Sequence, residues 1–280
     1  MSLVASYPRR AGQPYVPDRP FQEAVRLRAV SKIYETESGE TVHALSNINL
    51  DVRSGEFLSV IGASGCGKTT LLRIIAGLEG GYDGELSLRG DSASQVRRNV
   101  GIVFQDSNLL PWRNILQNVL LPAQVLRLDR RASIERAHEL IELVGLKGFE
   151  HKYPYELSGG MRQRISIARA LVHDPAVLLM DEPFGALDAL TREVMNVEVL
   201  KIWEATNKTV FMITHSISEA VFMGDRVVVM SPRPGRVVAE VDIALPRPRN
   251  IETLSGEAFA AYTGQLRRLL DIGSSRKEGA

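Results

Sequence analysis

One glycine-rich segment constrains this chain more than any other part of its sequence. Residues 62–69 read GASGCGKT and match the phosphate-loop pattern G-x-x-x-x-G-K-[ST]. The preceding residues 57–61 form an apolar run typical of a strand buried on both faces, and residues 69–76 have helical spacing. This order of strand, glycine loop and helix predicts an α/β fold that binds a nucleotide.

The residue types in this loop suit the binding of phosphate groups. Glycines let successive backbone N–H groups turn toward phosphate oxygens, and the following helix adds its positive end. Lys68 is expected to bring a cation to the β- and γ-phosphates, and Thr69 to offer its hydroxyl to Mg²⁺. The predicted nucleotide-binding residues are Gly62, Ala63, Ser64, Gly65, Cys66, Gly67, Lys68, Thr69 and Thr70. We expect no catalytic role for the Cys66 thiol.

An acidic pair follows a second apolar run. Asp181 and Glu182 come directly after residues 176–180, which predict a buried strand. At the end of a parallel strand beside the phosphate loop, Asp181 would hold Mg²⁺ and Glu182 would orient or deprotonate a water molecule. Alone, the pair fits a solvated acidic loop or a helix cap before Pro183 equally well, but the upstream phosphate loop favours the functional interpretation.

A third segment, residues 157–164, reads LSGGMRQR, and its Ser158 lies 23 positions before Asp181. Ser158 is a good N-cap, and Ile165, Ala168 and Val172 give the following residues an apolar helical face. The start of such a helix attracts anions, although the same residues fit an ordinary capped helix. By itself this segment is weak evidence of function.

Together these motifs resemble the ATP-binding subunit of ABC transporters, over residues 25–245 and in the family's order. Residues 62–69 look like the Walker A loop, 157–163 like the signature, 177–181 like Walker B and 186–188 like the D-loop. Single residues also match the family. Gln105 looks like the glutamine of the Q-loop, and Glu182 looks like the catalytic glutamate. His215 looks like the switch histidine, and Tyr34 looks like the aromatic residue that stacks on adenine. Tyr34 also fits a packed strand position. Met161 stands where the signature often has Gln, a substitution common in importer subunits.

The resemblance implies an α/β P-loop NTPase fold of the ABC type, with a mixed-sheet core, an antiparallel β subdomain and a helical insertion. It also implies ATP and Mg²⁺ as cofactors. Two subunits would pair head to tail, with each ATP between the Walker A loop of one and the signature of the other. Ser158 and Gly160 would contact the γ-phosphate in trans, and Asp188 would link the two sites.

At each ATP the resemblance assigns metal ligands and catalytic residues. Thr69, Gln105 and Asp181 would hold or sense Mg²⁺, and Gln105 would transmit closure to the membrane partner. Glu182 would activate water, while His215 would hold the γ-phosphate and help to place that water. Loss of the γ-phosphate would remove the contacts that bridge the dimer, so hydrolysis would open it.

Hydrophobic patterning divides the chain into three parts. Residues 1–24 hold several prolines without periodicity and are predicted to form a flexible tail. Residues 25–250 are expected to form the ATPase domain, with a helical insertion at about 106–165, where the strand signal fades. Residues 251–280 are expected to form a helical extension.

Several secondary-structure elements are also predicted. Alternating patterns over 25–34 and 42–52 predict antiparallel strands, and residues 209–214 a further buried strand. Residues 132–146 have helical spacing, and residues 255–272 carry an apolar stripe that predicts core packing. The turn formers SPRPG at 231–235 predict a hairpin or paired strand ends between their flanking apolar runs.

The composition excludes other classes of protein. Lys and Arg number 34 against 33 Asp and Glu, and this near-neutrality argues against a dedicated binder of duplex DNA. The single cysteine excludes an internal disulfide framework and fits a reducing compartment. No run approaches the roughly 18 apolar residues of a membrane span. The chain is therefore expected to be soluble, and peripheral at the cytoplasmic face of the inner membrane.

Three functions fit an ABC-type ATPase: transport, work on DNA or ribosomes, and a nucleotide switch with little hydrolysis. Residues 69–158 show no heptads, unlike the DNA-repair type, and one ATPase domain is present where the ribosome-associated type usually has two. Intact Glu182 and His215 argue against an inactive switch. We therefore expect a transporter ATPase that pairs with a second ATPase subunit and with integral-membrane permease subunits. A periplasmic or surface solute-binding protein would be an indirect partner, and nucleic acid is not expected as one.

Four short segments resemble those of ATP-binding subunits in the importers of nitrate, sulfonates and taurine. They are residues 108–113, 181–192, 231–236 and 245–249. Trp112 follows Gln105 closely and is a candidate anchor for the membrane partner, although a position packed under the helical insertion also fits. The solute stays open among nitrate, taurine, alkanesulfonates and other small molecules, because the binding protein and membrane subunits select it.

Overall fold

The computed structural model describes residues 23–35, 39–88 and 96–275. The predicted tail lies outside this part of the chain, apart from residues 23–24, which open the first strand. None of the helices in the described ranges is long and apolar enough to cross a membrane.

A six-stranded sheet with the order β5-β6-β7-β3-β8-β9 forms the centre of the molecule. Neighbouring strands from β5 to β8 are parallel, and the β8–β9 pair is antiparallel, which confirms the predicted mixed sheet and the hairpin around residues 231–235. Its strands are β3 Phe57–Gly62, β5 Val100–Val103, β6 Val177–Asp181, β7 Thr209–Thr214, β8 Arg226–Met230 and β9 Val237–Asp242.

A second, antiparallel sheet has the order β2-β1-β4 and confirms the strands expected in the first half of the chain. Its strands are β1 Glu23–Glu35, β2 Thr41–Arg53 and β4 Asp83–Leu88. Sequence patterning did not predict β4, because only one of its side chains, that of Leu88, is buried and the strand therefore lacks a clear apolar alternation.

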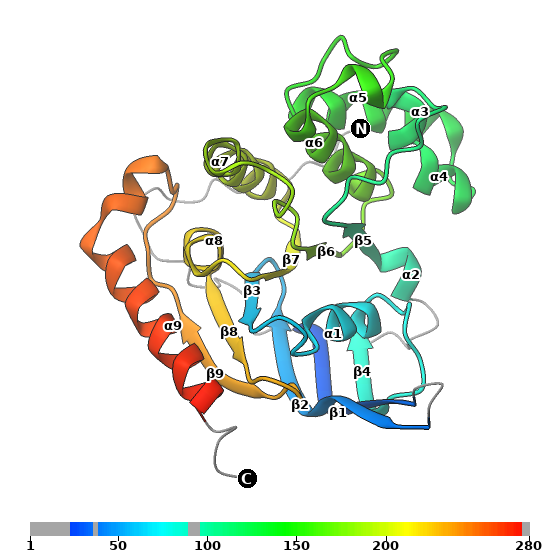
Figure 1. Cartoon of the computed structure of the whole chain (residues 1–280). Coiled ribbons are helices and arrows are strands. Elements are labelled where there is room, and N and C mark those ends of the chain that lie inside the picture. Colours follow the sequence, from blue (N-terminus) through cyan, green and yellow to red (C-terminus); the bar gives the residue numbers. More distant parts are fainter. Residues whose placement is uncertain (1–22, 36–38, 89–95, 276–280) are drawn as a thin grey trace.

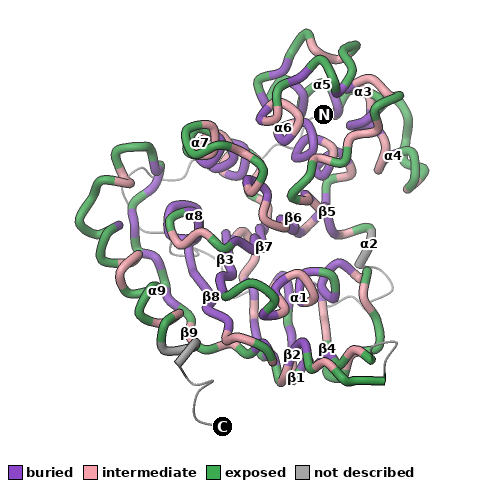
Figure 2. Tube along the Cα trace, in the orientation of Figure 1, coloured by how far each residue is buried: buried purple, intermediate pink, exposed green. Residues whose placement is uncertain are grey.

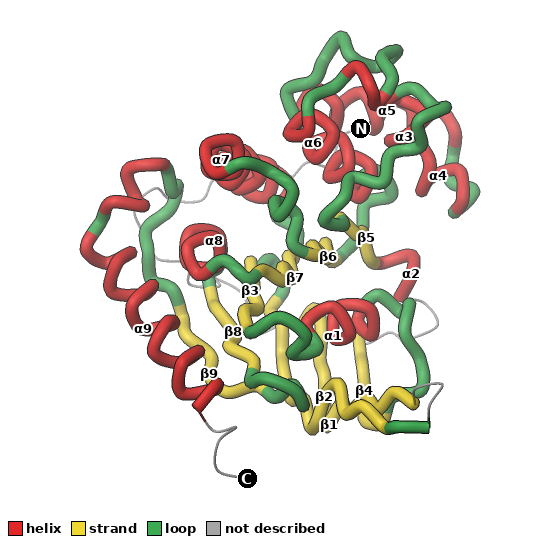
Figure 3. Tube along the Cα trace, viewed as in Figure 1, coloured by secondary structure: helices red, strands yellow, loops and turns green. Residues whose placement is uncertain are grey.

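Helices lie on both sides of the central sheet and in a separate group at one end (Figures 1 and 3). Those nearest the sheet are α1 Lys68–Ile75, α2 Val96–Asn99, α7 Ala189–Thr206, α8 Ile217–Met223 and α9 Glu257–Ser275. The end group holds α3 Ile115–Val119, α4 Leu121–Val125, α5 Arg130–Leu143, the 3-10 turn Pro154–Glu156 and α6 Gly159–Leu171. A second 3-10 turn, Ile251–Ser255, precedes α9.

Alternate side chains of the central strands enter two different cores. In β3, Leu58 and Val60 pack with α1 and the antiparallel sheet, whereas Phe57 and Ile61 pack in the core that includes α6, α7 and α8. Both faces of the sheet are therefore covered, as the burial colours show (Figure 2). This explains why β3, β6, β7 and β8 read as nearly continuous apolar runs.

The C-terminal segment is fastened to the domain by buried arginines and by α9. Arg247 pairs with Asp225 at 2.8 Å and lies over the Trp203 ring. Burial lowers the pKa of Arg249 to about 9, which still leaves the side chain charged at neutral pH. Its guanidinium donates to the carbonyls of Val221, Phe222, Gly224, Ile243 and Leu245. On α9, buried Phe259 and Leu266 confirm the predicted apolar stripe.

Candidate active site

The phosphate loop leaves the end of β3 and enters α1 at Lys68. Gly67 has a φ of 101°, and a Cβ there would lie 2.7 Å from the Ala44 carbonyl oxygen of β2. A Cβ on Gly62 would lie 2.7 Å from the Cys66 sulfur. Gly67 is therefore needed both for the left-handed turn and for the close packing of the loop against β2, and Gly62 leaves room for the Cys66 side chain.

Lys68 is buried and lies along its own loop. Its Nζ donates to the carbonyl oxygens of Gly62 at 2.8 Å and Ala63 at 3.1 Å. Gly67, the N-cap of α1, makes no side-chain cap hydrogen bond, so the first N–H groups of this helix can bind an anion. A cation and a helix start thus meet at one loop, which is the electrostatic setting that phosphate requires.

Thr69 of the first turn of α1 and Asp181 at the end of β6 come together beside the phosphate loop. The Thr69 hydroxyl donates to Oδ1 of Asp181 at 3.5 Å. Burial raises the pKa of Asp181, and the charge of Glu182 raises it further. A hydroxyl and a carboxylate are hard oxygen ligands of the kind that Mg²⁺ takes beside phosphates. No larger cluster of possible metal ligands occurs in the ranges that the structure describes.

Glu182 and His215 form the second close pair of the site. Nδ1 of His215 lies 3.0 Å from Oε2 of Glu182. Glu182 sits just past β6 with a φ of 44°, and its N–H donates to the Ile213 carbonyl of β7 at 2.9 Å. The parallel pairing of β6 and β7 therefore sets this contact. Both side chains are partly exposed, so water can reach the carboxylate.

The predicted Q-loop lies beside the segment that follows β6. A Cβ on Gly185 would come within 3.0 Å of Nε2 of Gln105. Helix α6 also holds this loop, since Gln163 donates to the Phe104 carbonyl at 3.1 Å. Arg169 adds bonds to the carbonyls of Ser107 and Asn108. The signature helix and the Q-loop are thus physically joined within one chain.

The signature residues lie apart from the phosphate loop of their own chain. Ser158 caps α6 by accepting from the Met161 N–H at 3.3 Å. Position 160 faces α7, because a Cβ on Gly160 would lie 3.5 Å from Thr191 and 3.6 Å from Met195. The start of α6 belongs to the end group of helices and is separate from α1 (Figure 1). The structure therefore does not bring Ser158 and Gly160 to Lys68 within the same chain.

Asp188 begins α7 as its N-cap. Its Oδ1 accepts from the Thr191 N–H at 3.0 Å, and hydrogen bonding to Thr191 lowers the pKa of this exposed carboxyl. Tyr34 lies near the end of β1 opposite Val42 of β2, two positions from Ala44, with Nζ of Lys32 4.7 Å from its ring centroid. Tyr34 is half-buried, so the ring retains an exposed part.

Sequence reasoning missed Arg233 as a neighbour of the phosphate loop. Its Nε and Nη2 lie 3.2 and 3.1 Å from the Gly65 carbonyl oxygen. In the same turn between β8 and β9, the Gly235 N–H donates to the Ala44 carbonyl. The turn formers at 231–235 predicted a hairpin, but no local pattern shows that this hairpin packs on the phosphate loop.

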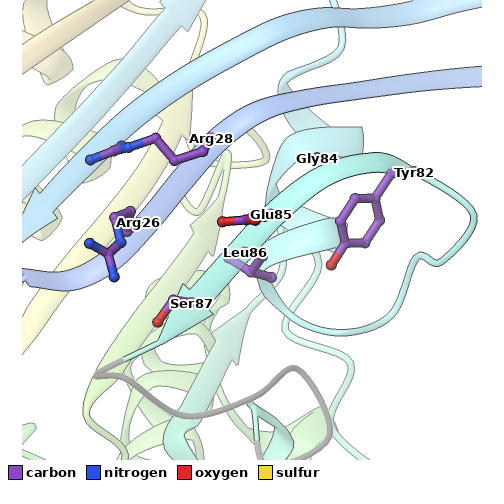
Figure 4. Close-up of a pocket in the computed structure, with 7 residues that line it drawn as sticks. All are labelled: Arg26, Arg28, Tyr82, Gly84, Glu85, Leu86 and Ser87. Atoms are coloured by element: carbon purple, nitrogen blue, oxygen red, sulfur yellow. The ribbon is translucent and has the colours of Figure 1, made fainter.

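A cavity of about 370 Å³ opens elsewhere, on the antiparallel sheet (Figure 4). It is lined by Arg26, Arg28, Tyr82, Gly84, Glu85, Leu86 and Ser87. Arg28 is already paired there with Asp51. None of the predicted site residues lines this cavity, so it takes no part in the nucleotide site.

These contacts define the class of the protein. A phosphate loop follows a buried strand, a Thr–Asp contact lies beside it, and a Glu–His contact lies at the ends of adjacent strands. This arrangement is typical of a P-loop nucleotide hydrolase. The family model described as ABC transporter matches residues 45–185. The chain belongs to the ABC transporter family, as an ATP-binding subunit that hydrolyses ATP.

Two curated relatives agree with this assignment. The taurine import ATP-binding protein TauB of Rhizobium johnstonii is 51% identical over 223 residues, which cover 80% of this chain and 85% of that protein. The aliphatic sulfonates import ATP-binding protein SsuB of Bacillus cereus is 44% identical over 226 residues, which cover 81% of this chain and 88% of that protein.

A solved structure has the same fold. It is the ATP-binding cassette MJ0796, a dimer in a post-hydrolysis state bound to ADP and Pi. The TM-score is 0.66 at 35% sequence identity, with 78% of this chain and 98% of that chain covered. The predicted ABC-type fold is thereby confirmed.

Proposed function

We propose that this chain powers the import of a small solute that carries a sulfonate group, such as taurine or an aliphatic sulfonate, through a membrane permease. The observation that carries the hydrolytic part is the 3.0 Å contact between Glu182 and His215 beside the Thr69–Asp181 pair. The solute class is supported by the identity with taurine and sulfonate import proteins over about four-fifths of this chain.

In this proposal, residues 62–70 bind the ATP phosphates through backbone N–H groups and Lys68. Thr69 and Asp181, with Gln105 nearby, supply oxygen ligands for Mg²⁺, which neutralises the charge of the β- and γ-phosphates when bound. Glu182 orients or deprotonates the water that attacks the γ-phosphorus, and the bond to the bridging oxygen of ADP breaks. His215 donates to the γ-phosphate and keeps Glu182 in place.

The second half of each site comes from a second copy of the chain. Ser158 and Gly160 lie apart from the Walker A loop of their own chain, so they are available to the γ-phosphate held by a partner subunit. Asp188 is exposed beside them and contacts the partner's site. Tyr34 stacks on adenine from β1, in the sheet that abuts the phosphate loop.

We further infer that different parts of the chain have different roles. Residues 25–250 act as the ATPase domain, with the helical insertion at about 106–165 facing the permease and 251–280 as an extension. Trp112 lies in this insertion with 71% of its surface exposed, which favours an interface role over packing under the insertion. The complex works at the cytoplasmic face of the membrane with a periplasmic or surface solute-binding protein, without nucleic acid.

Reconstitution tests this function directly. The chain is assembled in proteoliposomes with a permease and a solute-binding protein from the same organism, and ATP hydrolysis is measured with taurine, an alkanesulfonate, nitrate or no solute. We expect stimulation by taurine or the alkanesulfonate, and no stimulation of the Glu182→Gln complex. Equal rates with and without every solute would contradict the proposal, and stimulation by nitrate alone would replace the solute class.

A further inference from the structure

An ion pair lies behind the Glu182–His215 contact and has no part in the mechanism above. It joins Arg192 of α7 to Glu219 of α8, with Nε 3.5 Å from Oε1. The Glu219 side chain is only 6% exposed and that of Arg192 29%. An unpaired buried charge is costly, so Arg192 and Glu219 are expected to stay together. The pair therefore restricts the positions of the segments to which each side chain is also hydrogen-bonded.

Glu219 holds the residues on both sides of His215. Its Oε2 accepts from the Thr214 hydroxyl at 2.5 Å, and that hydroxyl accepts from the Ser216 N–H at 3.0 Å. The Ser216 hydroxyl in turn accepts from the Glu219 N–H at 3.3 Å. The backbone that carries His215 is therefore tied to the first turn of α8 by two hydrogen bonds at Glu219, and a third joins the residues on either side of His215.

Arg192 holds the D-loop. Its Nη2 donates to the Leu187 carbonyl at 2.9 Å. The Leu187 N–H donates to the Phe184 carbonyl at 3.1 Å, and the Gly185 N–H donates to the Glu182 carbonyl at 3.0 Å. The chain of contacts that begins at Arg192 thus returns to Glu182 through the segment that follows β6.

The contacts close into a ring. From Glu182 the ring passes through the D-loop to Arg192, across the ion pair to Glu219, through Thr214 to His215, and back to Glu182 at 3.0 Å. We infer that Arg192 and Glu219 are positioning residues for ATP hydrolysis, which hold the D-loop and the His215 backbone as one unit and so keep His215 against Glu182. This inference rests on the roles proposed above for Glu182 and His215.

The inference predicts a specific kinetic defect. Displacement of a catalytic group by about 1 Å can lower a rate by about 100-fold. Neither Arg192 nor Glu219 contacts the phosphate loop in any described hydrogen bond or ion pair. We therefore expect Arg192→Ala and Glu219→Gln to lower kcat at least about tenfold while KM for ATP stays within about twofold.

Steady-state ATP hydrolysis by the full chain gives kcat and KM, and thermal unfolding shows whether each variant is folded. Glu219→Gln keeps the shape of the side chain and serves if Arg192→Ala does not fold. Arg192→Lys restores the charge and is expected to recover at least half of the lost kcat. A merely stabilising pair would lower the melting temperature and leave kcat per folded molecule unchanged, which would overturn the inference, as would a rise in KM without a fall in kcat.

A spectroscopic readout reports the contact itself. The NMR spectra are recorded on the full chain labelled with ¹⁵N-histidine, and His215→Ala identifies the ring signals of His215. Arg192→Ala is expected to shift these signals, while the ring signals of His173 stay in place. Unchanged His215 signals would contradict the inference. Lys201→Ala is the matched control, because it breaks an exposed ion pair with Glu198 on the same helix and is expected to match the wild type.

Failure of this inference is separable from failure of the proposed function. If Glu182→Gln hydrolyses ATP at the wild-type rate, the proposed roles of the site residues fail. If Glu182→Gln is inactive while Arg192→Ala and Glu219→Gln retain the wild-type kcat, only the positioning role is lost.

Discussion

Oε2 of Glu182 lies 3.0 Å from Nδ1 of His215, although the residues are 33 positions apart in the chain. The backbone makes this contact possible, because β6 and β7 are parallel neighbours and the Glu182 N–H donates to the Ile213 carbonyl. A carboxylate and an imidazole at adjacent strand ends can share the placement of one water molecule.

Glu182→Gln is expected to lower ATP hydrolysis by at least about 100-fold, because an amide cannot accept the proton of the attacking water. ATP affinity should change little, since the side chain is similar in size. Phosphate release and isothermal titration measure the two effects, and ATP-dependent dimers should accumulate in size-exclusion chromatography. A variant that hydrolyses ATP normally would falsify the role of this carboxylate.

Lys68→Ala is expected to weaken ATP binding by about 10- to 100-fold, as the loss of one hydrogen bond to a charged group predicts. Titration calorimetry measures the affinity. Arg131→Ala is a suitable control, because this arginine is exposed in the end group of helices and pairs only with the nearby Glu135 among its described ion-pair partners. Equal affinities for the wild type and Lys68→Ala would remove Lys68 from the phosphate site.

The dependence of hydrolysis on Mg²⁺ should change with pH through Asp181. Burial, followed by the charge of Glu182, raises the pKa of this carboxyl, and protonation removes its metal-binding charge. As the pH falls from about 8 to about 5, the Mg²⁺ concentration for half-maximal hydrolysis should rise earlier than an ordinary aspartate would allow. In Asp181→Asn that concentration should be high throughout. A wild-type value that is constant over this range would contradict the assignment.

Trp112→Ala is expected to weaken assembly with the permease by about 30-fold, the typical effect of losing an aromatic anchor. Co-purification and surface plasmon resonance measure this, and hydrolysis by the isolated chain should stay unchanged. Ile251→Ala is the control, since Ile251 is also exposed but precedes α9, outside the proposed insertion. If assembly and solute-stimulated hydrolysis survive Trp112→Ala, the interface lies elsewhere.

Asp225→Ala is expected to lower the free energy of unfolding by about 3 kcal/mol, because it leaves the buried guanidinium of Arg247 without its carboxylate partner. The same carboxylate also accepts from the Phe57 N–H at 2.9 Å. Urea unfolding gives the change. Asp242→Ala serves as control, since that side chain is 75% exposed and should shift the value by less than about 0.5 kcal/mol. If Asp225→Ala and the wild type had equal free energies of unfolding, the ion pair with Arg247 would not contribute to stability.

Local patterns were enough to predict much of the fold. Strands β3, β6, β7 and β8 of the central sheet read as apolar runs because both of their faces are covered, and the glycines at 62–67 mark the loop by its backbone demands. Strand β5 is only four residues long and was not predicted. Patterning failed for β4, which buries one side chain, because an exposed strand has little apolar periodicity to detect.

The sequence by itself determined the chemistry of this protein: a phosphate loop, a pair of carboxylates, a signature and a histidine, in an order that predicts an ATPase. Only the tertiary structure decided which of these groups meet. It placed His215 against Glu182, held Arg233 on the phosphate loop, left Ser158 apart from Lys68 and joined Arg192 to Glu219. The reason is physical: residue types set the available chemistry, whereas long-range strand pairing and helix packing set the distances.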